Sequence, residues 1–316
     1  MAVGCEAAET SSLVVEHRVR SALAVAGLYR TGIPIAELAA LLPEGAPHGQ
    51  ALVDWLRSHP AVGRVDEGVA FHPEGFPGSV RGARRLRGEF YIENARALVA
   101  GDLAPARSLL RCLLVTGSAA YGEPEEGDDC DLMLVTRKGG LWTALAYLFL
   151  VFRVRRLRGG DRTSWCLNYA MDELQARAEF DRPRGFLFAR EALTSRPVLG
   201  ERYYLSLLGQ ATWMREEAPR LYARWATSGF PVPPSASSAP RAMRLLDSIL
   251  YPLVGAYLQA KALFANWQLR RQGRAEESFR TVTQPRKLAL VTTKYDRLNE
   301  LYRPATIVGA EPSGIA

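Results

Sequence analysis

Residues 113–118 read Leu-Leu-Val-Thr-Gly-Ser, and residues 129–135 read Asp-Cys-Asp-Leu-Met-Leu-Val after an interval of ten residues. Each stretch contains an apolar run suited to a buried strand, and the Gly-Ser pair is typical of a turn. We therefore predict a strand, a turn that opens a helix, a loop and a second strand. Because side chains two residues apart in a strand point to one face, Asp129 and Asp131 are predicted to present their carboxylates together.

This arrangement suits chemistry on phosphate groups. Two carboxylates on one face are suitable ligands for a hard divalent cation, Mg²⁺ or Mn²⁺, which shares its other positions with substrate phosphates. Gly117 allows a close approach of the backbone to a phosphate, and the Ser118 hydroxyl and the amides after it can donate hydrogen bonds. The two motifs therefore predict a site for a nucleoside triphosphate and a metal ion.

The bulk composition sets the broad class of the protein. With 316 residues and 48% apolar residues, the chain can form two or three domains with sizeable cores, which excludes wholesale disorder. The formal net charge of +7 favours an anionic partner, either a nucleotide, a nucleic acid or an acidic membrane surface. The charge alone does not select among these partners.

Cysteine spacing and apolar runs bear on the cellular compartment. The polar, acidic start of the chain is unlike a signal peptide, and the apolar run over residues 141–154 is shorter than the roughly 20 residues of a membrane span. We expect that run to be a buried helix rather than a membrane contact. None of the cysteines has CxxC spacing, so we expect reduced thiols in a cytoplasmic protein; they are Cys5, Cys112, Cys130 and Cys166.

Three short helices and a hairpin are predicted before residue 73, and their order resembles a winged helix. The third helix, residues 50–58, has little positive charge and an apolar Trp55 that we expect to be buried. A packing or partner-binding module is therefore favoured over one that reads DNA. The predicted elements are helices over residues 17–30, 35–42 and 50–58 and a hairpin over residues 61–71.

The spacing of Gly117-Ser118 and Asp129-Cys130-Asp131 resembles the signature of the polymerase-β-like nucleotidyltransferase superfamily. Residues 139–142 (Gly-Gly-Leu-Trp) and 166–173 (Cys-Leu-Asn-Tyr-Ala-Met-Asp-Glu) are similar to a little-characterised bacterial and archaeal branch of it. The resemblance implies a small α/β domain, with the Gly-Ser turn at the start of a helix and the paired acids on the next strand. It also implies a third acid on a neighbouring strand.

An α+β protein in three parts follows from the resemblance and the pattern along the chain. We expect a winged-helix-like domain over residues 1–80 and a mixed-sheet nucleotidyltransferase core over residues 81–200. A helical domain is expected over residues 201–316, with a flexible Pro/Ser-rich connector at residues 229–240. Within it, a long helix over residues 242–271 carries an apolar stripe that we interpret as core; the stripe is Leu246, Ile249, Leu250, Val254, Tyr257 and Leu258.

The expected third acid is missing from this sequence. The predicted strand over residues 165–171 has Asn168 where the superfamily often has Asp or Glu. An Asn oxygen can coordinate a metal ion but brings no charge. Asp172 is an alternative ligand if the strand continues, or else it caps a turn or helix. Arg137 and Lys138, directly after the acidic strand, either contact a phosphate or are exposed charges at a strand end.

The arginines before the motif have two interpretations as well. Arg81, Arg84, Arg85 and Arg87 lead into a helix predicted near residues 89–100, and a solvated helical face is the ordinary explanation for such a run. Because they precede the motif, contact with a triphosphate or nucleic acid is the alternative. Aromatic residues of the C-terminal part either line an acceptor pocket or pack in a core; these are Trp213, Trp225, Tyr251, Tyr257 and Trp267.

The sequence thus predicts a metal-dependent nucleotidyltransferase that moves a nucleoside monophosphate from a triphosphate to an acceptor and releases pyrophosphate. A small molecule is the favoured acceptor. One alternative is a regulatory protein that binds a nucleotide without turnover, favoured by Asn168 and disfavoured by the intact Asp129 and Asp131. The other is an enzyme that modifies a protein or RNA.

Overall fold

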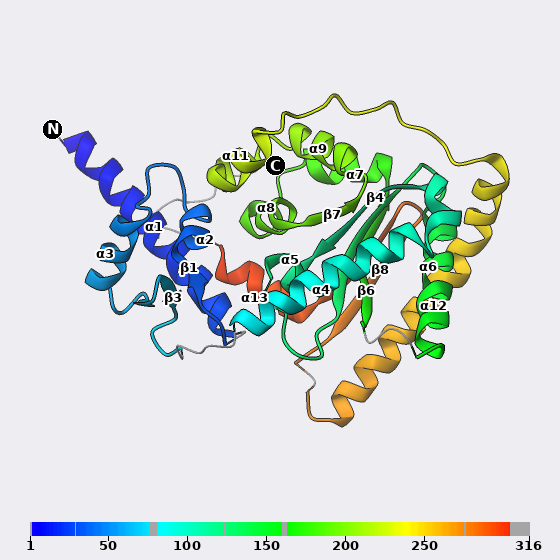
Figure 1. The fold of residues 1–316 in the computed structure, drawn as a ribbon, viewed down its shortest axis with the longest axis horizontal. Helices are drawn as coiled ribbons and strands as arrows, with labels where there is room; N and C mark the ends of the chain where they lie inside the picture. The colour runs from blue at the N-terminus through cyan, green and yellow to red at the C-terminus, as the bar shows by residue number, and fades with distance from the viewer. Residues whose placement is uncertain are drawn as a thin grey trace, which may run out of the picture. The chain divides into compact units, whose positions relative to one another are not determined.

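A computed structural model describes residues 2–28, 30–75, 81–122, 124–159, 163–274 and 276–303. The chain is a mixed α and β protein that divides into two compact units, residues 1–77 with 297–316 and residues 78–296 (Figure 1). None of the described helices is long and apolar enough to span a membrane. Among the described side chains, Cys112, Cys130 and Cys166 are free thiols, as expected.

The first unit contains helices near the N-terminus, a small antiparallel sheet and the last residues of α13 (Thr293–Leu301). Its strands lie in the order β1-β3-β2, with Ile33 opposite Ala70 and Val65 opposite the same residue from the other side. The predicted third helix and hairpin are confirmed, whereas the first helix begins well before residue 17. The elements are α1 (Ala2–Leu28), β1 (Ile33–Pro34), α2 (Ile35–Ala40), α3 (Gln50–Ser58), β2 (Arg64–Asp66) and β3 (Val69–Phe71).

Trp55 of α3 is half-buried rather than buried. Its ring stacks on His59 with centroids 4.3 Å apart, and the His59 imidazole is bonded through Nδ1 to the Trp55 carbonyl at 2.8 Å. Leu52 and Leu56 are the residues of α3 that enter the core of the unit. Leu52 and Leu56 therefore form the buried face of α3, and Trp55 lies at its margin.

A mixed six-stranded sheet with the order β7-β4-β5-β6-β9-β8 forms the centre of the second unit. Its central pair β5 and β6 is parallel, and every other neighbouring pair is antiparallel. The strands are β4 (Leu110–Thr116), β5 (Cys130–Thr136), β6 (Trp165–Asp172), β7 (Arg196–Leu199), β8 (Phe279–Gln284) and β9 (Lys287–Thr292).

One face of this sheet carries the main hydrophobic core. Alternate residues of the central strands, such as Val115, Leu132 and Leu134, pack against three long helices. The fully buried Trp142 lies at the centre, where its ring meets Tyr251 at 5.0 Å and its Nε1 donates to the Pro285 carbonyl at 3.1 Å. The helices of this face are α4 (Arg81–Ala100), α6 (Leu141–Leu157) and α12 (Arg241–Arg271), preceded by the 3-10 turn η1 (Ala104–Leu109).

Shorter helices pack on the opposite face, which bears Asp131. Buried side chains of α8 and α9 support strand β4 from this side, and α7 lies against β5. The run over residues 141–154 on the first face is a largely buried helix, as expected. The helices of the second face are α7 (Glu173–Asp181), α8 (Gly185–Thr194), α9 (Glu201–Gln210), α10 (Met214–Glu217) and α11 (Pro219–Ala226).

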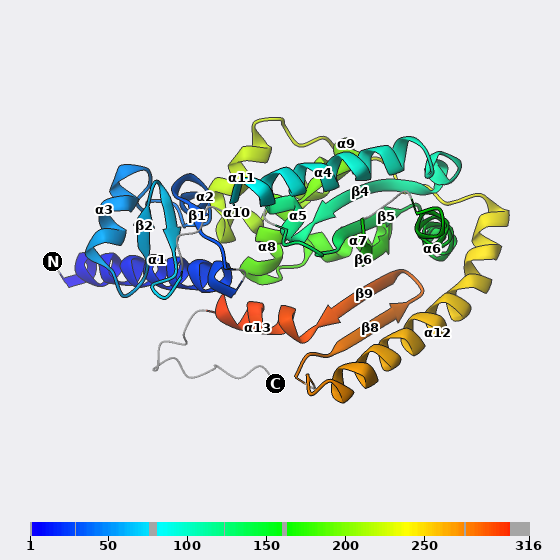
Figure 2. The same ribbon diagram turned by 60° about the horizontal axis from the view of Figure 1, so that its bottom comes forward.

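The C-terminal part is not purely helical, and in this the expectation for residues 201–316 was wrong. Strands β8 and β9 form a hairpin that extends the sheet, with Ala289 of β9 opposite Tyr169 of β6 (Figure 2). Burial of Leu288 and Ala289 explains the pairing, because these apolar side chains complete the core beside β6. Helix α13 (Thr293–Leu301) follows the hairpin.

Residues 229–240 are irregular but are bonded to the sheet domain rather than loose. The fully buried Glu173 accepts from the Ser237 backbone at 2.7 Å and from Arg111 Nε at 2.9 Å. Arg111 also donates to the Ser237 hydroxyl at 2.6 Å, and the Ala239 backbone donates to the Lys138 carbonyl at 3.0 Å. The buried carboxylate therefore anchors the connector.

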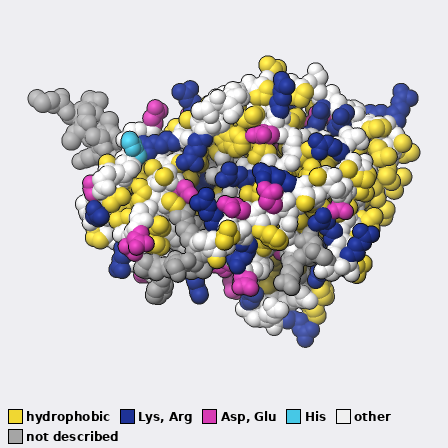
Figure 3. Space-filling view, in the orientation of Figure 1, with side chains coloured by type: hydrophobic (Ala, Val, Ile, Leu, Met, Phe, Trp, Pro, Cys, Tyr) yellow, Lys and Arg dark blue, Asp and Glu magenta, His cyan; other side chains and the backbone are white. Residues whose placement is uncertain are grey.

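The apolar stripe of α12 is only partly core. Leu258 is buried, and Leu250 and Val254 pack on the core beside it. Leu246 and Ile249, by contrast, are 40% and 53% exposed. Helix α12 is apolar around most of its circumference, and the sheet covers one side only; Figure 3 shows apolar side chains gathered on the surface over α12 and α6.

Replacing Trp142 by Ala is expected to lower the free energy of unfolding of the second unit by about 3–5 kcal/mol, because it removes a buried indole and the bond to Pro285. Urea unfolding followed by tryptophan fluorescence and circular dichroism measures this. Trp267→Ala is the matched control, because Trp267 is 50% exposed and its loss should cost less than about 1 kcal/mol. Equal destabilisation by the two substitutions would contradict the assignment of the core.

Candidate functional site

Asp131 lies where three strands bring polar groups together. It pairs in register with Thr116, the last residue of β4, and on its other side with Cys166 of β6. Directly after Thr116 the chain turns into the short helix α5 (Gly117–Tyr121). The predicted strand, turn and second strand are therefore confirmed, and they set the carboxylate of Asp131 beside the Gly117 turn.

Gly117 is required by the backbone at this turn. Its φ is +63°, a conformation that favours glycine, and a Cβ built there would be 2.7 Å from the Asp131 Oδ2 atom. A side chain at position 117 would therefore fill the space beside the carboxylate. Helix α5 has only five residues, so the Ser118 hydroxyl and the local backbone amides, rather than a long helix dipole, are what the turn offers to a ligand.

The acids before β5 have different surroundings. Asp129 is exposed and immediately precedes the strand, which begins at Cys130. Asp128 is turned back into its own loop, where its Oδ2 accepts from the Glu125 backbone at 2.8 Å and from the Ser118 hydroxyl at 3.3 Å. Asp129 and Asp131 are therefore the two carboxylates available to a ligand, and Asp128 positions Ser118.

Helix α4 holds the loop that carries these acids. Arg84, which is 7% exposed, forms an ion pair with Glu125 at 2.9 Å, and Arg87 donates to the Pro124 carbonyl at 2.9 Å. The Tyr91 hydroxyl donates to the Asp128 carbonyl at 2.8 Å. Arg84 and Arg87 are thus not free for a triphosphate, because they fix the loop. Arg85 lies on a solvated face, as its ordinary explanation predicted, where it pairs with Glu89.

Asn168 contacts Asp131 through an irregularity in β6. The register shifts between Leu132 and Met133 of β5, so that Leu167 and Tyr169 are their partners and Asn168 is the extra residue of a bulge. Its side chain is hydrogen-bonded to Asp131, while its Oδ1 accepts from the Cys166 thiol at 3.0 Å. Asn168 therefore orients the carboxylate of Asp131.

Burial raises the pKa of Asp131 to about 7. The hydrogen bond from Asn168 opposes this shift, and the negative charges of Asp129, Glu191 and Asp128 add to it. The site therefore gathers more negative charge than its own residues neutralise. A divalent cation would relieve this excess, so the donor set fits the metal ion that the resemblance implies.

Glu191 of α8 is a residue that the sequence reasoning missed. Its carboxylate accepts hydrogen bonds from the Tyr121 hydroxyl and from the backbone amide of Gly117. Burial raises its pKa, and Arg190 opposes the shift. Glu191 thereby fixes the Gly117 turn through hydrogen bonds to both ends of α5. A single acid beside Arg190 in the mostly apolar α8 was the only signal for it in the sequence.

Asp172 does not reach the site. It is the N-cap of α7, where its Oδ1 accepts from the backbone amides of Leu174 at 3.1 Å and Gln175 at 2.9 Å. Of the two roles considered for it, the capping role is the one observed. The described residues contain no group of three or more Asp, Glu, His or Cys side chains that could hold a metal ion. A cation at this site would therefore have two carboxylate ligands, from Asp129 and Asp131, and its other ligands would come from the substrate.

Arg137 and Lys138 lie at the other end of β5, so the expectation that they contact the phosphates was wrong. Six residues of extended strand separate Arg137 from Asp131, about 20 Å at the usual rise. The Lys138 backbone bonds to Glu173 and Ala239 instead. A residue directly after a strand lies at the far end of that strand, one strand length away from residues at its start.

The aromatic residues considered for an acceptor pocket mostly serve packing. Trp213 donates from Nε1 to the Phe180 carbonyl at 2.7 Å, and Trp225 donates to the Leu193 carbonyl at 2.7 Å. Tyr251 packs on Trp142, whereas Tyr257 and Trp267 are exposed on α12. None of them lines the region around Asp131.

Comparison of the chain with protein-family models, curated proteins and solved structures finds no match. The geometry around Asp131 therefore carries the functional argument by itself.

Replacing Asp131 by Asn is expected to stabilise the metal-free protein at about pH 8 and to leave its stability unchanged at about pH 4. Because the folded pKa of about 7 exceeds the usual 3.8, the folded state of the wild type loses stability as the pH rises between these values. The variant avoids this loss, by up to about 4 kcal/mol above pH 7. Urea unfolding in EDTA across this range measures the difference.

Asp66→Asn is the control for this experiment, because Asp66 is exposed on the hairpin of the first unit. The same pH series on this variant shows the effect of replacing an exposed aspartate by asparagine. If Asp131→Asn is less stable than the wild type at high pH, the charged Asp131 carboxylate stabilises the folded state, and the prediction is contradicted.

Proposed function

We propose that this protein is a metal-dependent nucleotidyltransferase that transfers a nucleoside monophosphate from a triphosphate to the hydroxyl group of a small acceptor. The observation that supports it most is the contact of Asp131 with the Gly117 turn. The exposed Asp129 carboxylate interacts electrostatically with the half-buried Asp131 carboxylate, and Ser118 directly follows Gly117 in the turn. A cation and a triphosphate need such a combination of groups.

Each residue has a distinct task in this proposal. Asp129 and Asp131 would hold the cation, which when bound neutralises the triphosphate and polarises its α-phosphorus. Ser118 and the amides after it would bind the terminal phosphates. The acceptor oxygen attacks the α-phosphorus, the bond to the bridging oxygen of the pyrophosphate breaks, and the hydroxyl proton leaves to solvent. Asn168 keeps the Asp131 carboxylate in place throughout.

A regulatory protein that binds a nucleotide without turnover is the second candidate. It is favoured by Asn168 in place of a third carboxylate and by the pair of carboxylates that this leaves. The first unit, with its resemblance to a winged helix, would then transmit the nucleotide state to a partner. Turnover is the property that separates the two proposals.

The double substitution Asp129→Ala/Asp131→Ala is expected to reduce transfer at least about a hundredfold, because charge stabilisation carries most of such catalysis. The assay supplies each α-labelled triphosphate with Mg²⁺ or Mn²⁺ and a cell extract, and follows label transfer and pyrophosphate release. Asp66→Ala, an exposed acid of the first unit, should retain full activity. Nucleotide binding without turnover in the wild type, under every condition, would favour the regulatory alternative.

Gly117→Ala is expected to weaken binding of a metal–triphosphate complex about tenfold or more, since its Cβ would crowd Asp131 Oδ2. Gly229→Ala is a matched control, because Gly229 has a similar φ of +70° but open space around its Cα. The two variants share the cost of a strained backbone, and only the first loses space at the site. Titration with a fluorescent triphosphate compares them, and equal affinities would refute the role of the turn.

A further inference from the structure

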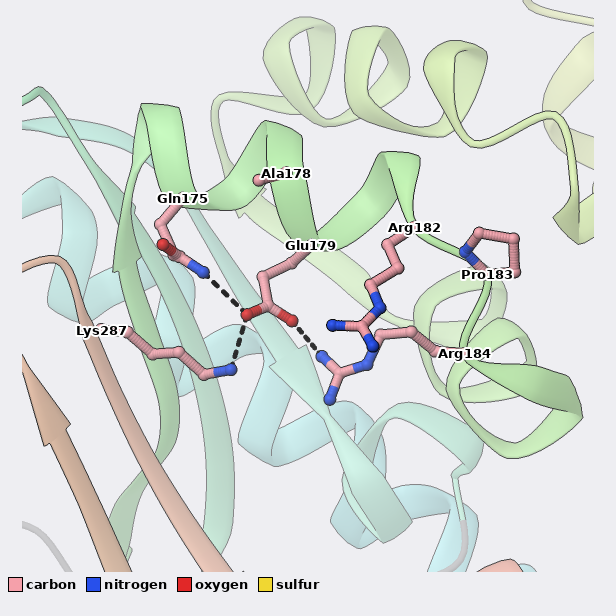
Figure 4. A pocket seen from close by; sticks show the side chains of 7 residues that line it. All are labelled: Gln175, Ala178, Glu179, Arg182, Pro183, Arg184 and Lys287. Atoms are coloured by element: carbon pink, nitrogen blue, oxygen red, sulfur yellow. Dashed lines mark hydrogen bonds and ion pairs between the residues drawn. The ribbon is translucent and has the colours of Figure 1, made fainter. Parts of the chain in front are cut away.

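A basic pocket lies on the same side of the sheet as Asp131, outside the residues assigned so far (Figure 4). Its volume is about 470 Å³, and it is formed by α7, the loop between α7 and α8, and the first residue of β9. The lining residues are Gln175, Ala178, Glu179, Arg182, Pro183, Arg184 and Lys287. Three of them are cations and one is an acid.

The acid holds two of the cations in place. Glu179 accepts hydrogen bonds from Lys287 at 2.6 Å, from Gln175 at 2.8 Å and from Arg184. Burial raises the pKa of Glu179, but the bonds from Lys287 and Gln175 outweigh this and lower it. Arg182, which is exposed, has no ion pair among the described residues. Glu179 therefore holds Arg184 and Lys287 in place, and the three cations of the lining exceed its one acid by two positive charges.

A phosphate monoester fits this charge, because it carries close to two negative charges at neutral pH. Arginine side chains also match the geometry of phosphate oxygens with two parallel donors. The N-terminal end of α8 lies at the same pocket, since Arg184 is the residue directly before that helix. A pocket of about 470 Å³ is larger than one phosphate, so it has room for part of the molecule that bears it.

Strand β6 connects this pocket to Asp131. Tyr169 is opposite Met133, which shares a face of β5 with Asp131, and its hydroxyl accepts from Arg184 at 2.9 Å. Lys287 lies over the Tyr169 ring at 5.1 Å. Lys287 is also in register with Met171, which pairs with Val135, four residues beyond Asp131 and thus about 13 Å along the strand. That distance is within the length of a small phosphorylated molecule.

We propose that this pocket binds the phosphate group of a small acceptor whose hydroxyl group receives the nucleoside monophosphate near Asp129 and Asp131. The assignment of the acceptor rests on the proposed function, whereas the binding of phosphate by the pocket is independent of it. Arg182, Arg184 and Lys287 contact the phosphate, and Glu179 keeps two of them in position. The bonds that form and break at the α-phosphorus are those given above.

The first test measures binding of inorganic phosphate by phosphorus NMR in EDTA, without nucleotide or metal. Arg182→Gln is expected to weaken binding about tenfold, the effect of one charged hydrogen bond. Because Arg182 is exposed, this variant should fold normally. Arg202→Gln removes an exposed arginine of α9 as a matched control, and Asp129→Asn alters the metal site alone; both should bind phosphate as the wild type does.

Two results would contradict phosphate binding by this pocket. One is an equal phosphate affinity of Arg182→Gln and the wild type. The other is binding that is lost in Ser118→Ala but retained in Arg182→Gln. The second result would put the phosphate at the Gly117 turn. A failure of nucleotidyl transfer leaves this test intact, because it requires no turnover.

The second test identifies the acceptor by treating the extract before the transfer assay. Phosphatase treatment of its small-molecule fraction should abolish transfer, whereas nuclease treatment should leave transfer unchanged. The Arg182→Gln variant should show a raised KM for the acceptor fraction with a KM for the triphosphate like that of the wild type. Transfer that survives the phosphatase, or is abolished only by the nuclease, would overturn the small phosphorylated acceptor.

Discussion

The contact between the Asp131 carboxylate and the backbone of Gly117 is the constraint on which the rest of the site depends. The carboxylate occupies the space that a side chain at position 117 would fill. Glu191 supports the turn from α8, Asn168 holds the carboxylate from β6, and Asp128 holds Ser118. Every one of these partners comes from a different element, so the site exists only when the sheet and α8 are assembled.

The same assembly concentrates negative charge that the protein itself does not neutralise. Desolvation raises the pKa of Asp131, and the nearby acids add to the effect. A protein would not be expected to keep such a group for stability, because the charged form is costly in the folded state. A cation bound with a substrate removes this cost, which is the physical reason for linking the site to a metal–nucleotide complex.

The second consequence of the assembly is the position of the C-terminal hairpin. Strand β9 pairs with β6, and this brings Lys287 to the Tyr169 ring and to Glu179. The hairpin turn is also tied to the core, because Trp142 donates to the Pro285 carbonyl. A segment far along the chain thereby supplies a cation to the face of the sheet that carries the acids.

Local patterns were sufficient for many of the elements. The apolar runs predicted strands β4, β5 and β6 and helix α12 to within a few residues, and the motif spacing predicted the approach of Gly117 and Asp131. The hairpin over residues 279–292 was missed, because β9 pairs with β6, a strand far earlier in the chain, and no local pattern shows that pairing. The wrong expectation for Arg137 and Lys138 had a different cause. Both residues are close to Asp131 in sequence, but the extended strand β5 places them at its opposite end.

The sequence by itself determined the candidate residues Gly117, Asp129 and Asp131 and the strands beside them, since strand periodicity and a glycine turn are local properties of the chain. The tertiary structure decided which groups those residues contact. It made Asn168 an orienting residue through a bulge, assigned Asp172 to a helix cap, and brought Glu191 and Lys287 to the same face of the sheet. These relations depend on packing between distant segments, and no local pattern encodes them.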